Sequence, residues 1–295
     1  IYRPIGLEDW YHILNTGYRF PAFGACDFPA CRFLGDARTY VWTEKSSSVR
    51  PTLPEWLRAG ANGQSFISTG PLVLLEVDGH RPGEKISLTE NQPKEVSVTI
   101  RVRCEVTPVQ HLDLIVNGKV IERLDIPTEK ARGEWYDLKR TLKIEESSWI
   151  AARAWSVTPG GQPDAEAHTN PVFVNINNRR PYQQASLDAW IQKIDGQIEI
   201  HTKREFKEKA AVLDYFQKAR DVLLKIRSQN GFAADVEPQA LISDSNDQPS
   251  DVSSIDITEA ELMEYLKPVP PVPPEKAVQQ FEVVDRFEMQ LVAAE

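Results

Sequence analysis

Cysteine is scarce in this chain of 295 residues, which contains only Cys26, Cys31 and Cys104. So low and odd a count excludes the disulfide framework that holds small secreted domains together. Cys26 and Cys31 lack the two-residue spacing of a zinc knuckle. Cys104 ends an alternating apolar segment, which is typical of a buried thiol. We therefore interpret all three as plain thiols rather than metal ligands.

The sequence also lacks any apolar run of about 18 residues, and so it predicts no membrane span. Asp and Glu outnumber Lys and Arg by 43 to 34, and the basic residues form no dense patch. Nucleic-acid binding depends on basic side chains that neutralise phosphates. A net charge of -9 therefore argues against a nucleic-acid partner.

Motifs of several catalytic classes are missing as well. There is no Gly-x-Ser-x-Gly elbow, no phosphate loop and no dinucleotide fingerprint. The histidines form no His-x-His pair and are scattered along the chain, at His12, His80, His111, His168 and His201. Since histidines placed in this way usually lie at surfaces or in turns, we expect none of them to bind a metal.

The chain begins at Ile1, without an initiator Met and without a signal peptide of basic start and apolar core. At its other end, a β-prone apolar segment stops shortly after a proline-rich stretch. We therefore expect an internal piece of a larger multidomain protein that lacks a complete catalytic site. We then expect the chain to have the remainder of the parent polypeptide as a partner.

What the sequence does contain divides into five segments. The first, residues 1–62, has the pattern of the end of an α/β unit. Its apolar spacing predicts a helix over 7–14, a buried strand over 19–26 that leads to Asp27, a strand over 38–42 and a short helix ended by Gly60. The other segments are a β-sandwich (63–180), a helical hairpin packed on the preceding domains (181–232), a disordered acidic and Pro-rich linker (233–280) and the start of a following domain (281–295).

The second segment shows strand signals at short intervals. Residues 96–104 alternate between apolar and polar, which is the period of a half-buried strand. Asn117-Gly118 between two apolar runs predicts a tight hairpin, because both turn positions need positive φ. About seven strands in this length favour a small antiparallel sandwich of immunoglobulin-like kind. In the third segment, Thr202 and Glu205 have the spacing of a capping box and predict the start of the second helix.

Asp27 is the best candidate for a functional group. An acid at the end of a buried strand is costly unless it is paired or bound to a metal. The alternative is a cap or turn residue that hydrogen-bonds the local backbone. Spacing alone leaves these two interpretations open.

Three stretches carry a resemblance to a known family: 17–27 (GYRFPAFGACD), 35–41 (GDARTYV) and 63–71 (GQSFISTGP). Together they resemble the CehA/McbA family of metallohydrolases, within the polymerase-and-histidinol-phosphatase superfamily. The resemblance extends over about residues 1–230. It implies a distorted α/β barrel of which residues 1–62 are the C-terminal remnant, with Asp27 as a ligand of a divalent metal of the zinc or manganese type. The superfamily's wider pattern is Asp-x-His, but Pro29 stands at its last position, which leaves the number of metals open.

The last residues carry a second resemblance. Residues 273–277, 281–283 and 287–295 resemble the opening of a β-propeller of the type found in haem-binding dehydrogenase-like proteins. Such propellers usually work outside the cytoplasm, so this resemblance implies an exported or periplasmic parent.

Two functions follow as hypotheses. In the first, the chain is the incomplete C-terminal portion of a metal-dependent hydrolase, whose parent cleaves an ester, carbamate, amide or phosphate with metal-activated water. In the alternative, the sandwich is a non-catalytic module that binds a glycan or partner, or merely acts as a scaffold. Trp135, Trp149 and Trp155 could then form a stacking platform, although core packing accounts better for at least two of them.

An open barrel remnant leaves strand edges and core faces uncovered. We therefore predict that the purified chain binds an apolar-surface dye more strongly than an intact globular control of similar size does. Fluorescence no greater than that of the control would contradict the barrel-remnant interpretation.

Overall fold

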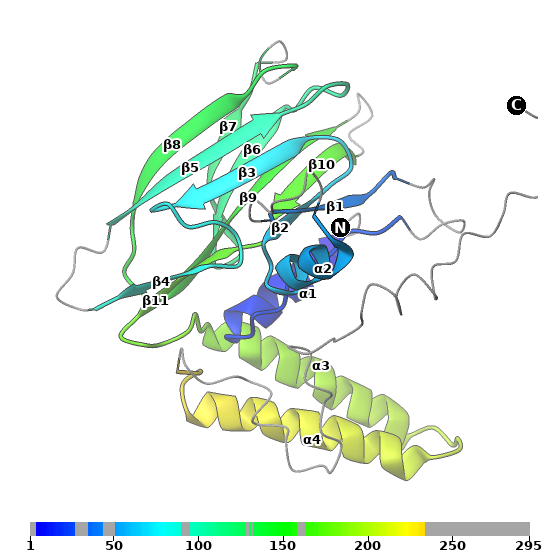
Figure 1. Cartoon of the computed structure of the whole chain (residues 1–295). Helices are drawn as coiled ribbons and strands as arrows, with labels where there is room; N and C mark the ends of the chain where they lie inside the picture. Colours follow the sequence, from blue (N-terminus) through cyan, green and yellow to red (C-terminus); the bar gives the residue numbers. More distant parts are fainter. Residues whose placement is uncertain are drawn as a thin grey trace, which may run out of the picture. The chain divides into compact units, whose positions relative to one another are not determined.

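A computed structural model describes residues 4–26, 35–43, 51–89, 95–127, 130, 132–157 and 163–233. All of them belong to one compact unit, which extends from Ile1 to Asp247. The described residues form a mixed α and β structure with four helices and two sheets (Figure 1), and they do not form a barrel. The helices are α1 (Pro4–Asn15), α2 (Leu53–Ala61), α3 (Gln184–Thr202) and α4 (Lys209–Ser228).

The larger sheet runs in the order β1-β2-β10-β9-β11-β4, and β6 pairs with β9 and β7 with β6. All its pairings are antiparallel except that of β11 with β4. The smaller sheet is antiparallel and has the order β3-β5-β8. The strands of the larger sheet are β1 (Arg38–Val41), β2 (Ser65–Ser68), β4 (Lys85–Leu88), β6 (His111–Val116), β7 (Lys119–Asp125), β9 (Ser148–Val157), β10 (Pro163–Thr169) and β11 (Val172–Ile176); those of the smaller are β3 (Leu72–Val77), β5 (Glu95–Arg103) and β8 (Tyr136–Lys143).

The two sheets share one apolar core, which gives them a sandwich-like arrangement. On β5 the alternation expected from the sequence is present, since Val98 and Ile100 are buried and their neighbours point outward. They belong to the same cluster as Leu112 and Leu114 of β6 and Ile150 of β9, which are on the larger sheet. The expected hairpin is confirmed too: β6 and β7 are joined by Asn117 and Gly118, whose φ angles are 50° and 81°.

A second cluster fixes α1 to the outer face of the larger sheet. Trp10 and Leu14 of α1 pack against Trp149 of β9 and Phe173 of β11. Asn15, at the end of α1, accepts a hydrogen bond from the Trp149 indole at 2.7 Å. Its amide nitrogen lies 3.1 Å both from the Asn117 carbonyl oxygen and from the Ser186 hydroxyl of α3. One side chain therefore connects α1 to a strand, a turn and the helical hairpin.

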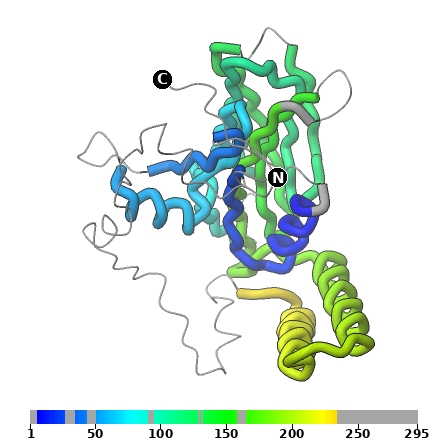
Figure 2. Tube along the Cα trace, turned by 90° about the vertical axis from the view of Figure 1, so that its right-hand side faces the viewer, coloured from blue at the N-terminus to red at the C-terminus, as the bar shows by residue number. Residues whose placement is uncertain are grey.

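The helical hairpin is confirmed as α3 and α4, which pack on each other around Leu187, Ile191, Ile226 and Phe232. It lies beyond one end of the strands, close to α1 (Figure 2). The expected capping box is wrong. α3 continues through Thr202, whose hydroxyl donates to the Ile198 carbonyl at 2.6 Å, so it cannot cap a following helix.

Two expectations for residues 1–62 need correction. Residues 19–26 do not form a buried strand, because their backbone bonds to side chains rather than to a neighbouring strand; Phe20 and Phe23 are 59% and 49% exposed. α2 does not end at Gly60 but continues to Ala61. The expected strand at 38–42 is confirmed as β1, and it pairs with β2 of the larger sheet.

Other expectations fall outside the described residues. They concern Asp27, Pro29, Cys31, almost the whole of the 233–280 linker and the 281–295 segment. Cys104 is buried as expected. No described helix has the length and apolar character needed to cross a membrane.

The packing of α1 yields a stability prediction. Trp149 is fully buried and bonded to Asn15, so Trp149→Ala should lower the free energy of unfolding by about 3–5 kcal/mol. Trp135→Ala is the matched control, since Trp135 is only half-buried and should cost much less. Urea unfolding followed by circular dichroism measures both. Equal losses for the two variants would contradict the central role of the Trp149 contact.

Candidate functional site

The segment that leads to Asp27 is held by side chains instead of a strand ladder. The Trp10 indole donates to the Phe20 carbonyl at 2.7 Å. Asn170, which is buried, accepts from the Ala22 N–H at 2.8 Å and donates to the Ala22 carbonyl at 3.1 Å. Two residues further on, the Thr39 hydroxyl accepts from the Gly24 N–H at 2.9 Å. The backbone is thus fixed at every second residue from 20 to 24, while Asp27 itself remains a prediction.

A pocket of about 380 Å³ lies beside this segment. Its lining includes Arg19, Pro21 and Asn170, together with the chain just after α2. The Arg19 guanidinium lies over the Phe173 ring, 5.1 Å from its centroid. Gly83 completes the wall with φ 86°, and a Cβ there would come within 2.2 Å of the Asn62 carbonyl oxygen. The pocket therefore depends on a glycine at this close approach of two backbones.

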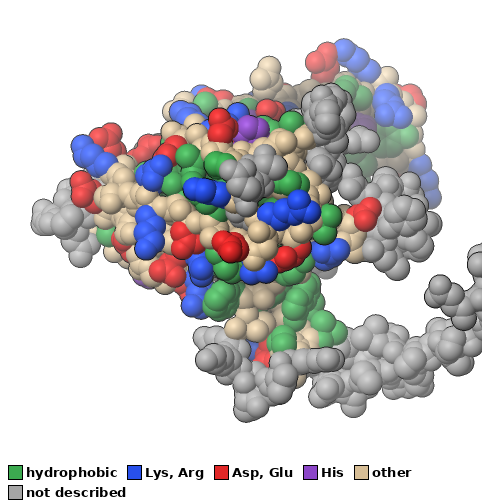
Figure 3. Space-filling view, turned by 90° about the horizontal axis from the view of Figure 1, so that it is seen from above, with side chains coloured by type: hydrophobic (Ala, Val, Ile, Leu, Met, Phe, Trp, Pro, Cys, Tyr) green, Lys and Arg blue, Asp and Glu red, His purple; other side chains and the backbone are tan. Residues whose placement is uncertain are grey.

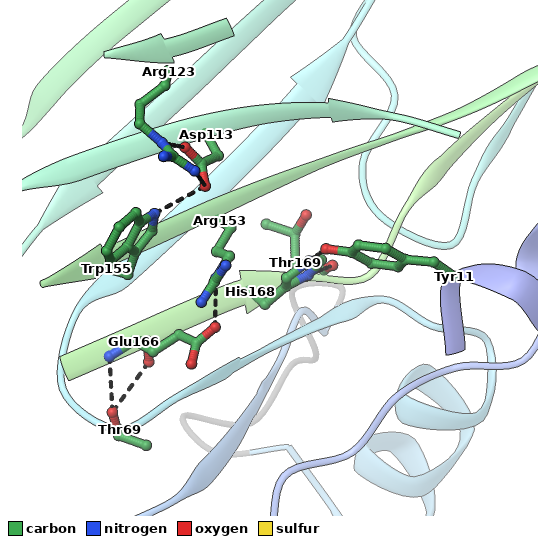
Figure 4. A network of polar contacts seen from close by, with 9 residues as sticks. All are labelled: Tyr11, Thr69, Asp113, Arg123, Arg153, Trp155, Glu166, His168 and Thr169. Atoms are coloured by element: carbon green, nitrogen blue, oxygen red, sulfur yellow. Dashed lines mark hydrogen bonds and ion pairs between the residues drawn. The ribbon is translucent and has the colours of Figure 1, made fainter. Parts of the chain in front are cut away.

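Away from the pocket, a network of polar side chains crosses the strands of the larger sheet (Figure 4). Asp113 of β6 is fully buried, and it accepts from Arg123 of β7 at 2.6 and 3.2 Å and from the Trp155 indole of β9 at 2.9 Å. The guanidinium also lies 5.0 Å from the Trp155 ring centroid. A buried carboxylate with three charge-assisted or indole donors is well compensated.

A second ion pair lies further along β9 and β10. Arg153 donates to the Glu166 carboxylate at 2.5 Å, and the Glu166 side chain is almost completely buried. The Glu166 backbone is in turn fixed by the Thr69 hydroxyl, which accepts from its N–H at 2.9 Å. Arg153 connects the two ion pairs through Trp155, whose ring centroid is 5.3 Å away.

His168 lies on β10 in the core of the unit, so the expectation of a surface or turn histidine is wrong for this residue. Its Nδ1 lies 2.7 Å from the Thr169 carbonyl and must donate to it. Nε2 is then left as an acceptor for the Tyr11 hydroxyl of α1 at 2.5 Å. Burial lowers the pKa of His168 to about 4 and raises the pKa of the Tyr11 phenol far above its usual range. Both groups are therefore neutral and satisfied, which suits a structural contact.

The other four histidines do not lie at the Tyr11–His168 contact. His12 lies 2.9 Å from the Ser186 hydroxyl, His80 is in a turn, His111 pairs with Asp125 and His201 packs on Phe216. Within the part of the chain that the structure describes, no group of three His, Cys, Asp or Glu side chains could hold a metal. No local pattern indicates the Tyr11–His168 contact, because its two partners lie 157 positions apart.

The three tryptophans proposed as a stacking platform do not lie together. Trp149 is buried under α1, and Trp155 is half-buried between His111, at 4.3 Å, and two arginines. Trp135 precedes β8 of the smaller sheet, with Arg101 over its ring at 5.0 Å. Core packing and intramolecular stacking therefore account for Trp149 and Trp155.

Comparison with known proteins leaves the family open. No family model and no curated protein matches the chain. Among solved structures, an engineered protein of the Northeast Structural Genomics Consortium is 22% identical over 36% of this chain and 20% of its own, with a TM-score of 0.22. pT26-6p is 8% identical over 61% of this chain and 43% of its own, with a TM-score of 0.25. The superoxide reductase neelaredoxin from Ignicoccus hospitalis is 18% identical over 36% and 80%, with a TM-score of 0.22. The chain thus spans less than half of the first two, and scores this low do not identify a shared fold.

The burial of His168 predicts how stability depends on pH. The unfolded chain binds a proton there near pH 6.5, but the folded chain does so only at about pH 4. The contribution of His168 to the free energy of unfolding is therefore fully present above pH 6.5. It falls as the pH drops from 6.5 toward 4, by on the order of 3 kcal/mol. His168→Gln should remove this part of the pH dependence. Urea unfolding from pH 7 to 4.5 tests it, and His80→Gln, in an exposed turn, should behave as wild type. Identical pH profiles for wild type and His168→Gln would refute the assignment.

Proposed function

We propose that the chain is the C-terminal portion of a metal-dependent hydrolase of the CehA/McbA type. The complete parent hydrolyses an ester, carbamate, amide or phosphate. Asp27 binds a divalent metal of the zinc or manganese type. When bound, this metal supplies an activated water as nucleophile.

The observation that carries the proposal is the way in which residues 20–24 are held. A metal ligand must be placed within fractions of an ångström, and ligands on rigid elements are placed best. Here an irregular segment gains comparable rigidity from Trp10, Asn170 and Thr39, which bond its backbone at three successive alternate residues. These bonds anchor the chain three residues before Asp27. They also place a pocket with Arg19 in its wall next to the same segment.

Exposed apolar side chains near this segment give further support. Phe20 and Phe23 are 59% and 49% exposed, and Leu53 and Leu57 of α2 are 39% and 41% exposed. The two leucines are four positions apart and so lie on one face of the helix. Apolar faces of this kind normally pack against another part of a protein. Upstream barrel strands are the partner that the family resemblance implies.

The same strands would complete the metal site. Asp27 offers a single carboxylate, whereas a catalytic metal needs about three protein ligands and one open position. Among the described residues, no group of three His, Cys, Asp or Glu side chains could supply the other ligands. The role of this chain is then to supply one ligand, the wall of the substrate pocket and the scaffold that fixes both. Arg19 lies where it could orient an anionic or carbonyl oxygen of a substrate.

A second candidate function is a non-catalytic module that binds a glycan or a partner. Trp149 cannot contribute to it, because it is buried. A cleft of about 190 Å³, lined by residues of β1 and β3 at the edges of the two sheets, favours this function instead, and it does not depend on Asp27.

Metal content tests the hydrolase. A polypeptide that adds the upstream strands to this chain should bind zinc or manganese near stoichiometrically, and Asp27→Ala should weaken metal binding by about 10–100-fold. Glu8→Ala, an exposed carboxylate on α1, is the control and should leave metal content unchanged. Elemental analysis after dialysis measures both, and nitrophenyl ester and phosphate hydrolysis should fall in parallel with the metal. Full metal content in Asp27→Ala would disprove the role of Asp27.

A further inference from the structure

A cleft of about 190 Å³ opens where an edge strand of each sheet comes close to the other. β1 is the edge of the larger sheet and β3 that of the smaller. Tyr40 of β1 and Trp42, just after this strand, line one side, and Glu76 of β3 and Arg101 of β5 line the other. The volume is about that of one sugar ring, much smaller than a typical drug-sized site of roughly 300–1,000 Å³.

Aromatic rings form one wall of this cleft. Tyr40 stacks face to face on Phe66 of β2, with ring centroids 4.8 Å apart and planes inclined by only 6°. Trp42 lies one residue beyond the end of β1, and its N–H continues the pairing with a bond to the Gln64 carbonyl at 2.7 Å. Because this bond extends the ladder, Tyr40 and Trp42 point to the same side of the sheet. Trp42 is 44% exposed. The stacked rings of Tyr40 and Phe66 and the exposed Trp42 ring give the cleft an aromatic wall, which is suited to the C–H face of a sugar or to another flat apolar body.

Arg81 stands at the mouth of the cleft with its guanidinium 3.8 Å from the centroid of the Trp42 ring. It is exposed, and within the described part of the chain no carboxylate forms an ion pair with its guanidinium, although the Glu84 carboxylate accepts from its backbone N–H at 2.8 Å. By contrast, Arg101 of the same cleft is paired with Asp137 at 3.0 Å. Stacking on Trp42 restricts the side chain, so the donors of Arg81 are already ordered for an external anion.

Hydrogen-bond acceptors line the same cleft from the smaller sheet. Glu76 is exposed on β3 and lies directly across from Thr99 of β5. Neither the ion pairs nor the side-chain hydrogen bonds of the described residues include the Glu76 carboxylate. A carboxylate accepts hydrogen bonds from hydroxyl groups, and a hydroxyl such as that of Thr99 both donates and accepts. The cleft therefore combines an aromatic wall, one cation for an anion and acceptors for hydroxyls.

We propose that this cleft binds a sugar residue that carries a carboxylate, of the hexuronate class. The ring packs on Tyr40 and Trp42, its carboxylate accepts from Arg81, and its hydroxyls donate to Glu76. A neutral sugar would leave Arg81 unpaired. A simple anion would leave the aromatic wall unused and would meet repulsion from Glu76. A nucleic acid would face the same carboxylate in a chain of net charge -9.

Titration of the whole chain with short oligomers of galacturonate, glucuronate and mannuronate tests the proposal, with calorimetry as readout. At least one free acid should bind. Its methyl ester has the same ring without the charge, and its affinity should be lower by a factor of about ten or more. Arg81→Gln should lower the affinity for the free acid to that for the ester. Trp42→Ala should lower the affinity for both ligands by roughly tenfold. Circular dichroism confirms that each variant is folded.

Arg103→Gln is the matched control, because Arg103 lies on β5 of the same sheet but pairs with Glu105 outside the cleft. It should bind as wild type does. The proposal is overturned if none of the free acids binds, if acid and ester bind equally, or if Arg103→Gln loses as much affinity as Arg81→Gln. The test is independent of the hydrolase, because Trp10, Asn170 and Thr39, which hold residues 20–24, do not line this cleft.

Discussion

The contact between the Trp149 indole and Asn15 is the constraint on which the arrangement of the helices depends. Through its other atoms, Asn15 reaches the β6–β7 turn and the first turn of α3. α1 is thereby fixed both to the larger sheet and to the helical hairpin. Its Trp10 in turn holds the Phe20 carbonyl, which begins the series of bonds along residues 20–24. The candidate site is therefore positioned by a helix that contributes no chemistry of its own.

Charged side chains in the core of the larger sheet form ion pairs, whereas Arg81 on its rim forms none with the described residues. Asp113 and Glu166 are buried, and each is matched by an arginine on a neighbouring strand. Such pairs add little net stability, but breaking one leaves a costly buried charge, and they therefore fix strand register. On the rim, the Arg81 guanidinium lies over an aromatic ring and forms no ion pair among the described residues. Charged side chains of both signs are interspersed over the face seen in Figure 3, with groups of apolar side chains between them.

Local patterns in the sequence predicted those parts of the fold that local forces decide. The alternation along β5 and the Asn117-Gly118 turn need only neighbours within a few residues, and both are present. The conformation of residues 19–26 was mispredicted because their backbone partner, Asn170, lies almost 150 positions away. His168 was misplaced for the same reason, because its partner Tyr11 lies 157 positions away. The cap at Thr202 is wrong for a local reason, because α3 continues through Thr202 and the hydroxyl bonds to the Ile198 carbonyl one turn earlier. The short β4 and the polar β10 were not expected, because pairing rather than propensity makes them strands.

The distances in sequence between α1 and its partners have a consequence for synthesis of the chain. α1 emerges from the ribosome before its partners Trp149, His168 and Ser186, which follow it by more than 130 residues. At about 5–20 residues per second, the apolar face of α1 waits roughly 10–30 s for the strands that cover it. During that time Trp10 and Leu14 have no native partner on the larger sheet. Until β9 and β11 have been made, a nascent chain therefore carries an apolar helix face that its own larger sheet does not yet cover.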